Sequence, residues 1–518
     1  MGIQAADIDS DQGLETMLKT QLRLLERLPE KNELNEITSA PLFTYPVLAH
    51  AKKLAAESSA RSFSQYALFA GDSDGLRQKA TDPRIFHNVS APSSVFICGS
   101  QGSGKSHTLS CILENCLIQS SELGSLSKPL TGIVFHYDTF VSDTMASPCE
   151  AAYLASNPSV KVRVLCSPTN IGTMKKCYGR LPNVDVEELR LKESHLNTKR
   201  MLDLMAFDDQ GSPLYFQVIQ RILREMRIAQ QSTGSGFKYR EFTSLLAGED
   251  LLPGQIRPLN QRLDMLESFM VPSETQSNTS YSTWGCTGTD WTPRASSLTI
   301  IDLSCPCVTA AMACSLFNVC LSIFLEQDSS LGRVIALDEA HKYMGESAEC
   351  ATLTNNLLSA IRLQRHLGAR VVISTQEPTI SPKLLDLCSV TVVHRFTSPD
   401  WLHVLTKHLA GISTMTKVAG QLDDADGGAP LAPATEADGL RGMVVASDSP
   451  ILELFARIVS LATGEALVFA PSAIVGLDTR SVPGGGSLVT HRRLAHHVLH
   501  VRVRGRITTD GGQSVMAV

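Results

Sequence analysis

The sequence has no excess of charge of either sign: 46 Lys and Arg stand against 52 Asp and Glu, and the net charge is −6 over 518 residues. A balance this close to zero gives no overall attraction to nucleic acid or to an anionic membrane, so any such binding has to come from a local patch. With 43% apolar and 19% charged residues, the composition is that of a globular protein with a large core. The length corresponds to roughly two to four domains.

Targeting signals and a disulfide framework are also missing. The N-terminus has neither the hydrophobic core of a secretory signal nor the Ser or Thr at position 6 that N-myristoylation favours. The 13 cysteines show no framework spacing, so we expect reduced, mostly buried thiols. Only Cys305, Cys307, Cys314 and Cys320 cluster, and the last two fall in an apolar helical pattern, which argues against a metal site. These absences favour a cytoplasmic or nuclear protein.

One stretch, residues 308–325, is apolar enough to suggest a transmembrane helix. It contains Asn318 and three hydroxyl-bearing residues, and basic residues do not flank it. It also lies inside an alternation of strand and helix patterns. We therefore expect a buried helix that crosses between two strands, and no membrane partner.

A glycine-rich loop is the strongest motif. Residues 99–106 read G-S-Q-G-S-G-K-S and fit G-x-x-x-x-G-K-[ST] between the apolar run 95–98 and the helical pattern 107–118. In this setting the loop N–H groups bind phosphate oxygens, Lys105 reaches the β- and γ-phosphates, and Ser106 ligates Mg²⁺. ATP is favoured over GTP because no N-K-x-D motif is evident. The residues expected to contact the nucleotide are Gly99, Ser100, Gln101, Gly102, Ser103, Gly104, Lys105, Ser106 and His107.

Two apolar strands end in an aspartate, 298–301 before Asp302 and 334–337 before Asp338. Each resembles the strand that holds Mg²⁺ in P-loop enzymes. Only Asp338 is followed by a second carboxylate, Glu339, where a general base for water would stand beside the metal. We therefore assign Asp338 to Mg²⁺ and Glu339 to activation of the attacking water. The reverse assignment, with Asp302 at the metal, stays open.

Two later strands lead to polar residues. Residues 370–375 precede Gln376, a candidate sensor of the γ-phosphate, and residues 390–393 lead to Arg395, a candidate to reach a nucleotide across a subunit interface. The plainer alternatives are an ordinary strand-end glutamine and a surface ion pair. Near the C-terminus, residues 500–507 alternate basic and apolar side chains. They are the local candidate for contact with nucleic-acid phosphates, and the alternative is a solvated edge strand.

The order of these patterns predicts an α/β fold, the three-layer α/β/α sandwich of P-loop NTPases with a mostly parallel sheet. Five segments are expected from changes in periodicity and composition. They are a helical N-terminal segment at 1–93, the first part of the core at 94–184, a helical insertion and polar loop at 185–297, the rest of the core at 298–475 with a flexible insertion at 425–442, and a basic tail with one strand at 476–518.

Four motifs together resemble the ATPases of the HerA/FtsK group: G-S-Q-G-S-G-K-S at 99–106, L-D-E-A-H-K-Y at 337–343, I-S-T-Q-E-P at 373–378 and V-H-R-F at 393–396. The similarity covers about residues 90–475, and the whole chain resembles fungal AAA-like ATPases of that kind. The resemblance implies an extra strand between the phosphate-loop strand and the Mg²⁺ strand. It also implies a catalytic Glu339, a polar sensor Gln376, an Arg395 acting on the adjacent subunit, and a homo-hexamer that moves DNA or peptide through a pore.

The chain departs from that group at both ends. It shows no β-barrel pattern before the core and no compact DNA-orienting domain after it. DNA translocation is therefore a weaker expectation than ATP hydrolysis, because a fold does not carry its cargo with it.

Two other functions are alternatives to an ATPase of this group. Residues 338–341 spell D-E-A-H, as in DEAH-type RNA helicases, but the spacing from Lys105 is far too long, S-T-Q stands where those helicases have S-A-T, and no Q-x-x-G-R-x-G-R follows. An ATP-binding switch or scaffold with little hydrolysis stays open. The presence of Glu339 with Lys105, Ser106 and Asp338 favours a Mg²⁺-dependent ATPase, since a binding module has no chemical need for Glu339.

Overall fold

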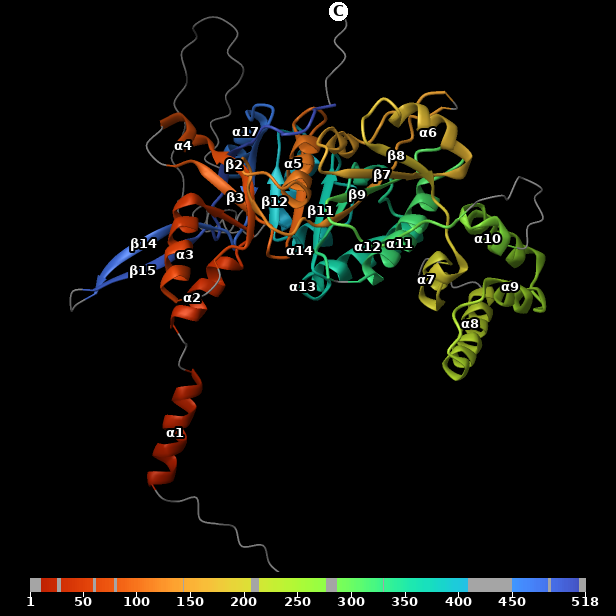
Figure 1. Cartoon of the computed structure of the whole chain (residues 1–518), viewed down its shortest axis with the longest axis horizontal. Helices are drawn as coiled ribbons and strands as arrows, with labels where there is room; N and C mark the ends of the chain where they lie inside the picture. The colour runs from red at the N-terminus through yellow and green to blue at the C-terminus, as the bar shows by residue number, and fades with distance from the viewer. Residues whose placement is uncertain are drawn as a thin grey trace, which may run out of the picture.

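The computed structural model describes residues 11–25, 29–58, 62–78, 82–142, 144–205, 214–275, 287–328, 330–408, 450–482 and 486–511. One mixed sheet runs through the molecule (Figure 1). Its parallel part consists, in sheet order, of β12 (Val390–Val393), β4 (Ser94–Cys98), β11 (Ala369–Thr375), β10 (Arg333–Leu337), β6 (Thr131–His136), β9 (Ser297–Asp302), β7 (Lys161–Cys166) and β8 (Val184–Glu188). Every residue of β4, β6, β10 and β11 is buried, as expected of parallel strands covered on both faces.

Helices cover both faces of these strands. Alternate residues of a strand face opposite sides of the sheet, so apolar strands need a layer of helices on each side. Phe96, Ile335 and Ile373 pack into one core with α11 (Ala310–Glu326), α12 (Ala348–Arg362) and α14 (Pro382–Leu387). Val95 and Val334 pack into a second core with α5 (Lys105–Leu117), η1 (Glu150–Ser156) and α6 (Ile171–Tyr178). The predicted three-layer α/β/α sandwich is confirmed. The structure also describes α13 (Gln364–Leu367), α15 (Pro399–His408) and α17 (Pro450–Val459).

The helix over the apolar stretch is α11, and its core-facing residues from Ala313 to Leu321 are all buried. It connects β9 to β10 across one face of the sheet, so it is a buried crossover helix as expected. Among the described residues, none of the helices combines the length and the apolar character that a membrane span requires.

The N-terminal residues were expected to be helical, and this was wrong for three strands. Helices α1 (Asp11–Leu25), α2 (Pro29–Thr38), α3 (Tyr45–Ser58) and α4 (Ser73–Gln78) are present, but β1 (Leu42–Thr44), β2 (Gln65–Asp72) and β3 (Arg84–Asn88) join the sheet. These strands pair with one another and with strands from the C-terminal end of the chain. Short strands held by such distant partners leave little local periodicity, because packing decides their conformation.

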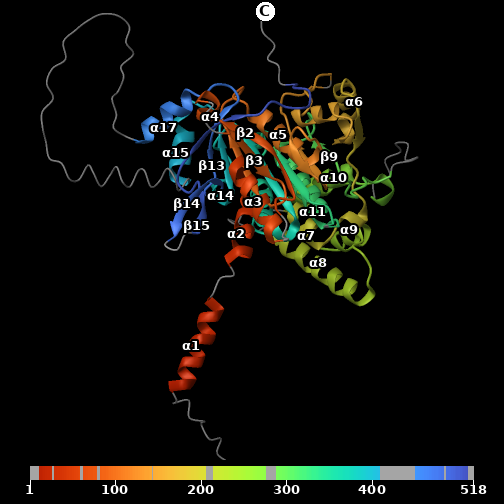
Figure 2. The ribbon, with the colours of Figure 1, turned by 60° about the vertical axis from the view of Figure 1, so that its left-hand side comes forward.

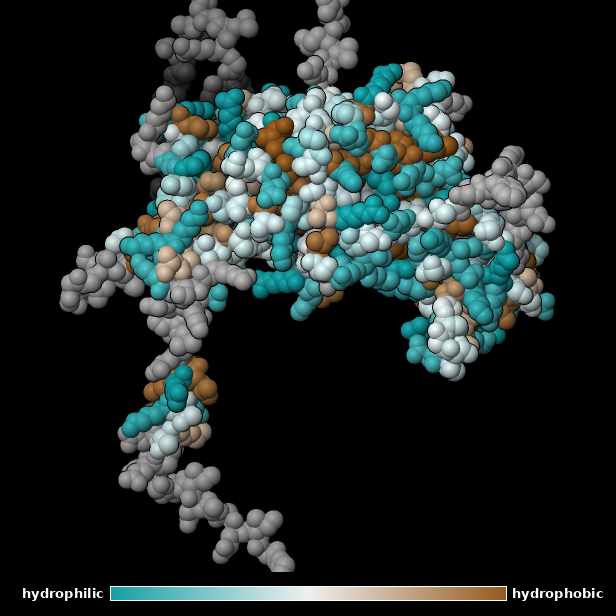
Figure 3. Space-filling view, viewed as in Figure 1, coloured by the Kyte–Doolittle hydropathy of each residue, from teal (hydrophilic) through white to brown (hydrophobic). Residues whose placement is uncertain are grey.

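Helix α1 differs from the others because it extends away from the body of the molecule (Figures 1 and 2). It carries apolar side chains that face solvent, among them Leu24 at 81% and Leu25 at 75% exposure. Figure 3 shows brown, hydrophobic residues on this helix. The core cluster nearest in sequence begins only at Leu34 of α2.

The segment between β8 and β9 carries α7 (Thr198–Leu204), α8 (Leu214–Thr233), α9 (Tyr239–Ala247) and α10 (Pro253–Phe269), in agreement with the predicted helical insertion. The green helices at the lower right of Figure 1 belong to it. Part of the polar loop, 276–286, and the predicted flexible insertion at 425–442 lie outside the described residues. The division into five segments stays a prediction.

The C-terminal part completes the sheet with β13 (Glu465–Phe469), β14 (Ile474–Val482), β15 (Gly486–Arg493) and β16 (Leu499–Val503), and β5 (Gly124–Leu126) pairs with β2. Strand β16 lies between β13 and β2, so the expectation of an edge strand was wrong. Its apolar face, Val501 and Val503, is buried as the alternation predicted. The strand that pairs with the free edge of β16 is N-terminal β2, which the sequence pattern alone could not show.

The arginines after β16 are tied to the helix that follows the phosphate loop. Arg504 donates to Glu114 of α5 (2.7 Å), and Arg506 pairs with Glu150 of η1. Glu114 is fully buried and also accepts from the N–H (3.0 Å) and hydroxyl (2.6 Å) of Thr508. Arg504 and Arg506 are therefore structural, and their expected contact with nucleic-acid phosphates is not supported by where they lie.

We predict that Glu114→Ala destabilises the protein strongly, because it leaves the buried Arg504 guanidinium without its carboxylate. Removing one partner of a buried ion pair costs about 3 to 5 kcal/mol. The measurement is the thermal unfolding midpoint, with Glu122→Ala as the control because Glu122 is exposed. Equal midpoints for the two variants would contradict the structural role given to Glu114.

Candidate functional site

The phosphate loop connects β4 to α5 and adopts a backbone that requires glycine. Gly99, Gly102 and Gly104 have φ of 152°, 71° and 113°. A Cβ on Gly99 would lie 2.7 Å from the Cβ of His394, and one on Gly104 would lie 3.2 Å from the backbone nitrogen of Gly464. Glycine at these positions therefore lets phosphate oxygens come close to the loop N–H groups and to the N-terminus of α5.

Strand β12 and the segment after it support the loop from behind. The N–H of Ser100 donates to the carbonyl of Arg395 (2.9 Å), and the N–H of His394 donates to the carbonyl of Cys98 (2.8 Å). The His394 ring is buried; its Nδ1 donates to the carbonyl of Glu465 and its Nε2 accepts from the hydroxyl of Thr108, both at 2.9 Å. Burial lowers the pKa of His394 to about 4, so the ring is neutral at pH 7.

Lys105 is buried at the start of α5, and its ammonium donates to the Ser100 carbonyl (3.0 Å). Burial lowers the pKa of Lys105, while the carboxylates of Glu339 and Asp338 act in the opposite direction. The lysine therefore faces both carboxylates and rests on the loop itself. His107 lies two residues after Lys105, and its ring points away from the phosphate loop, because its Nε2 bonds with the Arg504 carbonyl (2.8 Å).

Strand order brings the remaining predicted residues to the same edge of the sheet. Strand β11 lies between β4 and β10, as the family resemblance implied. In its register Thr375 pairs with Cys98 of β4 and Ile373 pairs with Leu337 of β10. Because all three strands are parallel, the loop, Gln376 and Asp338 follow their carboxyl ends side by side.

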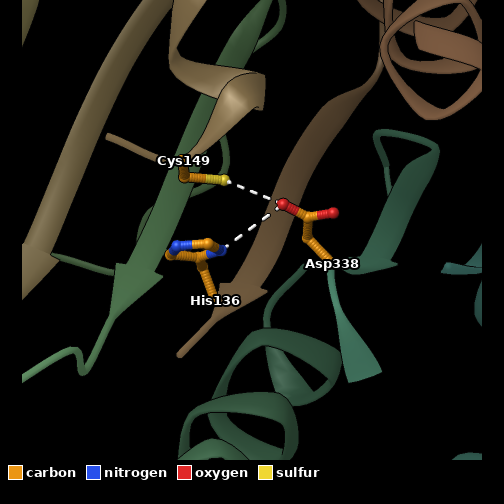
Figure 4. Close-up of side chains that lie close together, drawn as sticks. All are labelled: His136, Cys149 and Asp338. Atoms are coloured by element: carbon orange, nitrogen blue, oxygen red, sulfur yellow. Dashed lines mark hydrogen bonds and ion pairs between the residues drawn. The ribbon is translucent and has the colours of Figure 1, made fainter. Parts of the chain in front are cut away.

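Asp338 lies in a buried cluster with His136 and Cys149 (Figure 4). Its Oδ2 is 3.4 Å from His136 Nδ1 and 3.7 Å from Cys149 Sγ. Burial raises the pKa of Asp338, but the hydrogen bonding and charge of His136 outweigh it and hold the pKa below its ordinary value. Burial likewise lowers the pKa of His136, and the Cys149 and Asp338 groups outweigh that effect and raise it.

The residues at this edge fit a Mg²⁺ ion. Asp338 Oδ1 is buried and has no hydrogen-bond partner within the described ranges, so it is free to accept from a metal-bound water. Ser106 lies in the first turn of α5, where its hydroxyl belongs to the same motif as Lys105. The other strand-end carboxylate is occupied: Asp302 is fully buried, accepts from Tyr178 Oη (2.5 Å) and from the N–H of Ser304 (3.0 Å). This geometry disfavours the alternative that placed Asp302 at the metal.

Glu339 has a strained backbone, and both oxygens of its carboxylate accept hydrogen bonds. Its φ is +50°, a region that non-glycine residues rarely adopt and that tends to mark functional sites. Gln376 Nε2 donates to both carboxylate oxygens of Glu339 (2.8 and 2.6 Å), and His341 Nε2 lies 3.5 Å from one of them. Burial lowers the pKa of His341. The predicted base and the predicted sensor are thus in direct contact.

Arg395 is exposed, and its side chain makes no hydrogen bond or ion pair with any residue in the described part of the chain. Its carbonyl supports the loop, as given above. The arginine stands at the same edge of the sheet as the loop but is not packed against Asp338 or Glu339 by any contact that the structure records.

Three residues of the site were missed from the sequence. His136 ends an apolar strand just as Asp302 does, and this strand-end position was the signal that could have found it. Cys149 lies outside regular structure and Trp401 lies in α15, where it donates from Nε1 to the Gln376 carbonyl (2.7 Å). Neither has a local sequence signal, because only the folded topology brings them to the site.

Comparison with protein-family models and with curated proteins finds no match. Among solved structures, VirB4 of Thermoanaerobacter pseudethanolicus matches at 10% identity and a TM-score of 0.43, over 86% of this chain and 98% of that one. Plasmid coupling protein TrwB in complex with ADP and Mg²⁺ matches at 12% and 0.40, over 87% and 97%. The genome packaging NTPase B204 from Sulfolobus turreted icosahedral virus 2, in complex with ATP-gammaS, matches at 8% and 0.26, over 78% and 98%.

Of these three solved structures, two contain a bound nucleotide: ADP with Mg²⁺ in TrwB and ATP-gammaS in B204. Their low identities and TM-scores below 0.5 decide neither activity nor substrate for this chain. The comparisons contain nothing that supports the expected similarity to fungal AAA-like proteins.

We predict that Gly99→Ala weakens nucleotide binding at least tenfold, because the new methyl group meets both an unfavourable φ and the His394 side chain. Gly102→Ala is the matched control: its φ is also positive, but nothing lies within 4 Å of the added Cβ. Titration with a fluorescent ATP analogue measures both affinities. Similar affinities for the two variants would show that the contact with His394 does not shape the loop.

A second prediction concerns His394 and pH. The unfolded chain binds a proton at this residue below pH 6.5, whereas the folded chain does so only below about 4. The stability that the neutral ring provides is therefore complete above pH 6.5 and is lost as the pH falls toward 4, by about 2 kcal/mol at pH 5. Urea unfolding at pH 7.5 and pH 5 should show a smaller loss for His394→Asn than for the wild type. Equal losses would mean that His394 titrates normally in the folded protein.

Proposed function

We propose that this chain is a Mg²⁺-dependent ATPase of the HerA/FtsK type. The observation that carries the proposal is the meeting of Lys105, Asp338, Glu339 and Gln376 at the carboxyl ends of three adjacent parallel strands. A phosphate-binding loop, a metal-binding carboxylate and a second carboxylate for water are the parts that phosphoryl transfer to water needs.

Binding of the triphosphate is the task of the loop. The phosphate oxygens accept from the N–H groups of residues 99–106, and Lys105 exchanges the Ser100 carbonyl for the β- and γ-phosphates. Burial favours this exchange, since a buried ammonium gains more from an anionic phosphate than from a neutral carbonyl. His107 contributes through the first turn of the helix, since its ring is engaged with the C-terminal segment.

Ser106 and Asp338 would hold Mg²⁺, which supplies charge neutralisation for the phosphoryl group when bound. Asp338 stays ionised for this task, because His136 keeps its pKa low. Its unpartnered Oδ1 is the atom available for a metal-bound water.

Glu339 orients and deprotonates the attacking water, and Gln376 controls when it can do so. As the structure stands, both carboxylate oxygens of Glu339 accept from Gln376. A γ-phosphate that draws the Gln376 amide away frees one oxygen of Glu339 for water, so the same contact senses the nucleotide and restrains the base. Positioning of this kind is the main source of catalysis in phosphoryl transfer.

Assembly and cargo form the finer part of the proposal. Arg395 is exposed beside the loop and has no ion-pair partner among the described residues, which supports a homo-hexamer in which this arginine reaches the nucleotide of the adjacent subunit. DNA is the proposed cargo, although Arg504 and Arg506 do not serve it. An ATP-binding switch is the second candidate, and the occupied carboxylate of Glu339 is the observation that favours it.

We predict that Glu339→Gln lowers ATP turnover by at least a hundredfold and changes ATP affinity by less than about threefold, because it removes the base and leaves the loop intact. Phosphate release measures turnover, and a fluorescent nucleotide measures affinity. Glu377→Gln is the control, since Glu377 is exposed and adjacent to Gln376.

The same assay, run with and without single- or double-stranded DNA and beside a sizing column in ATP, separates the candidates. Turnover that rises with DNA in a hexamer-sized particle supports the translocase. Tight ATP binding by a monomer, with no turnover that Glu339→Gln removes, leaves the switch.

A further inference from the structure

The cluster around Asp338 contains two groups that Mg²⁺ does not need. His136 ends β6, Cys149 precedes η1, and Asp338 follows β10, so three separate segments bring a nitrogen, a sulfur and an oxygen together (Figure 4). All three residues are buried, with 7% exposure for His136 and less for the others. The three donor atoms lie within 4.8 Å of one another.

Two of the buried polar atoms lack the hydrogen bonds that burial normally demands. Asp338 Oδ1 has no hydrogen-bond partner in the parts of the chain that the structure describes, and His136 Nδ1 has only the long 3.4 Å contact with Asp338 Oδ2. An unsatisfied buried polar atom costs about 1 to 3 kcal/mol. In Figure 4 the His136 ring and the Cys149 thiol point toward Asp338 Oδ2, while Oδ1 points away from both. Three buried donors that meet in this way, with bonding capacity left over, are the arrangement expected of an unfilled ligand site.

The spacing matches a tetrahedral metal site. Zn–N and Zn–S bonds of about 2.0 and 2.3 Å place neighbouring ligand atoms roughly 3.3 to 3.7 Å apart. The observed separations are 3.4 Å between His136 Nδ1 and Asp338 Oδ2, and 3.7 Å between Cys149 Sγ and the same oxygen. Small side-chain shifts would therefore let the three donors converge on one ion.

The donor set selects the class of ion. Mg²⁺ takes oxygen ligands, whereas a thiolate and an imidazole suit Zn²⁺ and other borderline transition metals. A supporting shell also exists, because the N–H of Cys149 donates to Tyr178 Oη (2.9 Å) and Tyr178 donates to Asp302. Such outer contacts orient metal ligands in general.

We propose that His136, Cys149 and Asp338 form a binding site for a borderline divalent transition metal, for which Zn²⁺ is the probe. The ion takes Nδ1, the Sγ thiolate and a carboxylate oxygen, the proton on Nδ1 and the thiol proton both pass to solvent, and the fourth position stays open to water. This site is distinct in its ligands from the Mg²⁺ site, but the two share Asp338.

Sharing Asp338 has a consequence for activity, and this consequence rests on the proposed ATPase function. An ion bound to His136 and Cys149 draws Asp338 away from the Mg²⁺ position. Zn²⁺ should therefore inhibit Mg²⁺-dependent turnover, and a chelator should restore it. Metal binding at this site would inhibit the ATPase.

Binding is tested without nucleotide, so that its outcome does not depend on any ATPase activity. Co²⁺ is titrated into the full-length protein with the exposed Cys307 replaced by Ser, and the thiolate-to-cobalt absorption band is followed before Zn²⁺ displaces it. The proposal expects one equivalent with a band that Cys149→Ser abolishes. Cys350→Ser is the matched control, because its thiol lies 3.2 Å from that of Cys314 and the two together are an alternative place for Co²⁺ to bind thiolate.

Absence of the band, its persistence in Cys149→Ser, or its loss in Cys350→Ser would overturn the proposal. His136→Gln gives an independent readout if Cys149→Ser fails to fold, and it should weaken Zn²⁺ binding at least tenfold.

The activity arm compares Zn²⁺ inhibition in each variant with that variant's own Mg²⁺-dependent rate. Cys149→Ser should need at least tenfold more Zn²⁺ for half inhibition. Equal sensitivity of Cys149→Ser and the wild type to Zn²⁺ would overturn the proposed inhibition through this site. Metal binding without turnover in any variant would refute the ATPase proposal and leave the metal site standing.

Discussion

Buried charge at the carboxyl ends of adjacent parallel strands is the constraint on which the rest of this structure depends. Lys105 and Asp338 are both almost fully removed from water, and neither could be buried without compensation. The lysine rests on a loop carbonyl and faces two carboxylates, and the aspartate is stabilised by His136. The site therefore holds buried charges that are only partly compensated. An anionic ligand that brings a metal ion, such as a nucleotide with its cation, would stabilise them.

The scaffold holds these charges by tying both ends of the chain to the phosphate loop. Gly464, just before β13, donates from its N–H to the Ser103 carbonyl of the loop (3.3 Å). Beyond β16, Arg504 is bonded to Glu114 on the helix that the loop opens, and strand β16 itself pairs with N-terminal β2. The phosphate loop is thus joined through hydrogen bonds and strand pairing to segments that are distant in sequence.

Features that depend on local sequence patterns could be predicted, and features that depend on contacts between distant segments could not. The phosphate loop and the Asp338-Glu339 pair could be predicted, because a glycine spacing and a carboxylate after an apolar strand are local patterns with a chemical reason. The position of β11 between β4 and β10 followed from the family resemblance. The pairing of β1 and β2 with C-terminal strands could not be predicted, and neither could the conversion of Arg504 and Arg506 into partners of buried carboxylates, because those outcomes depend on contacts between the two ends of the chain. Cys149 and Trp401 were missed because neither has a local sequence signal and only the folded topology brings them to the site.

The central claim is that these residues hydrolyse ATP, and phosphate release by the purified full-length chain with ATP, before and after Mg²⁺ is removed with EDTA, tests it most directly. Phosphate release over many turnovers that stops with EDTA and returns with added Mg²⁺ is the predicted result. ATP that binds tightly in the presence of Mg²⁺ and remains intact through the incubation would contradict the account.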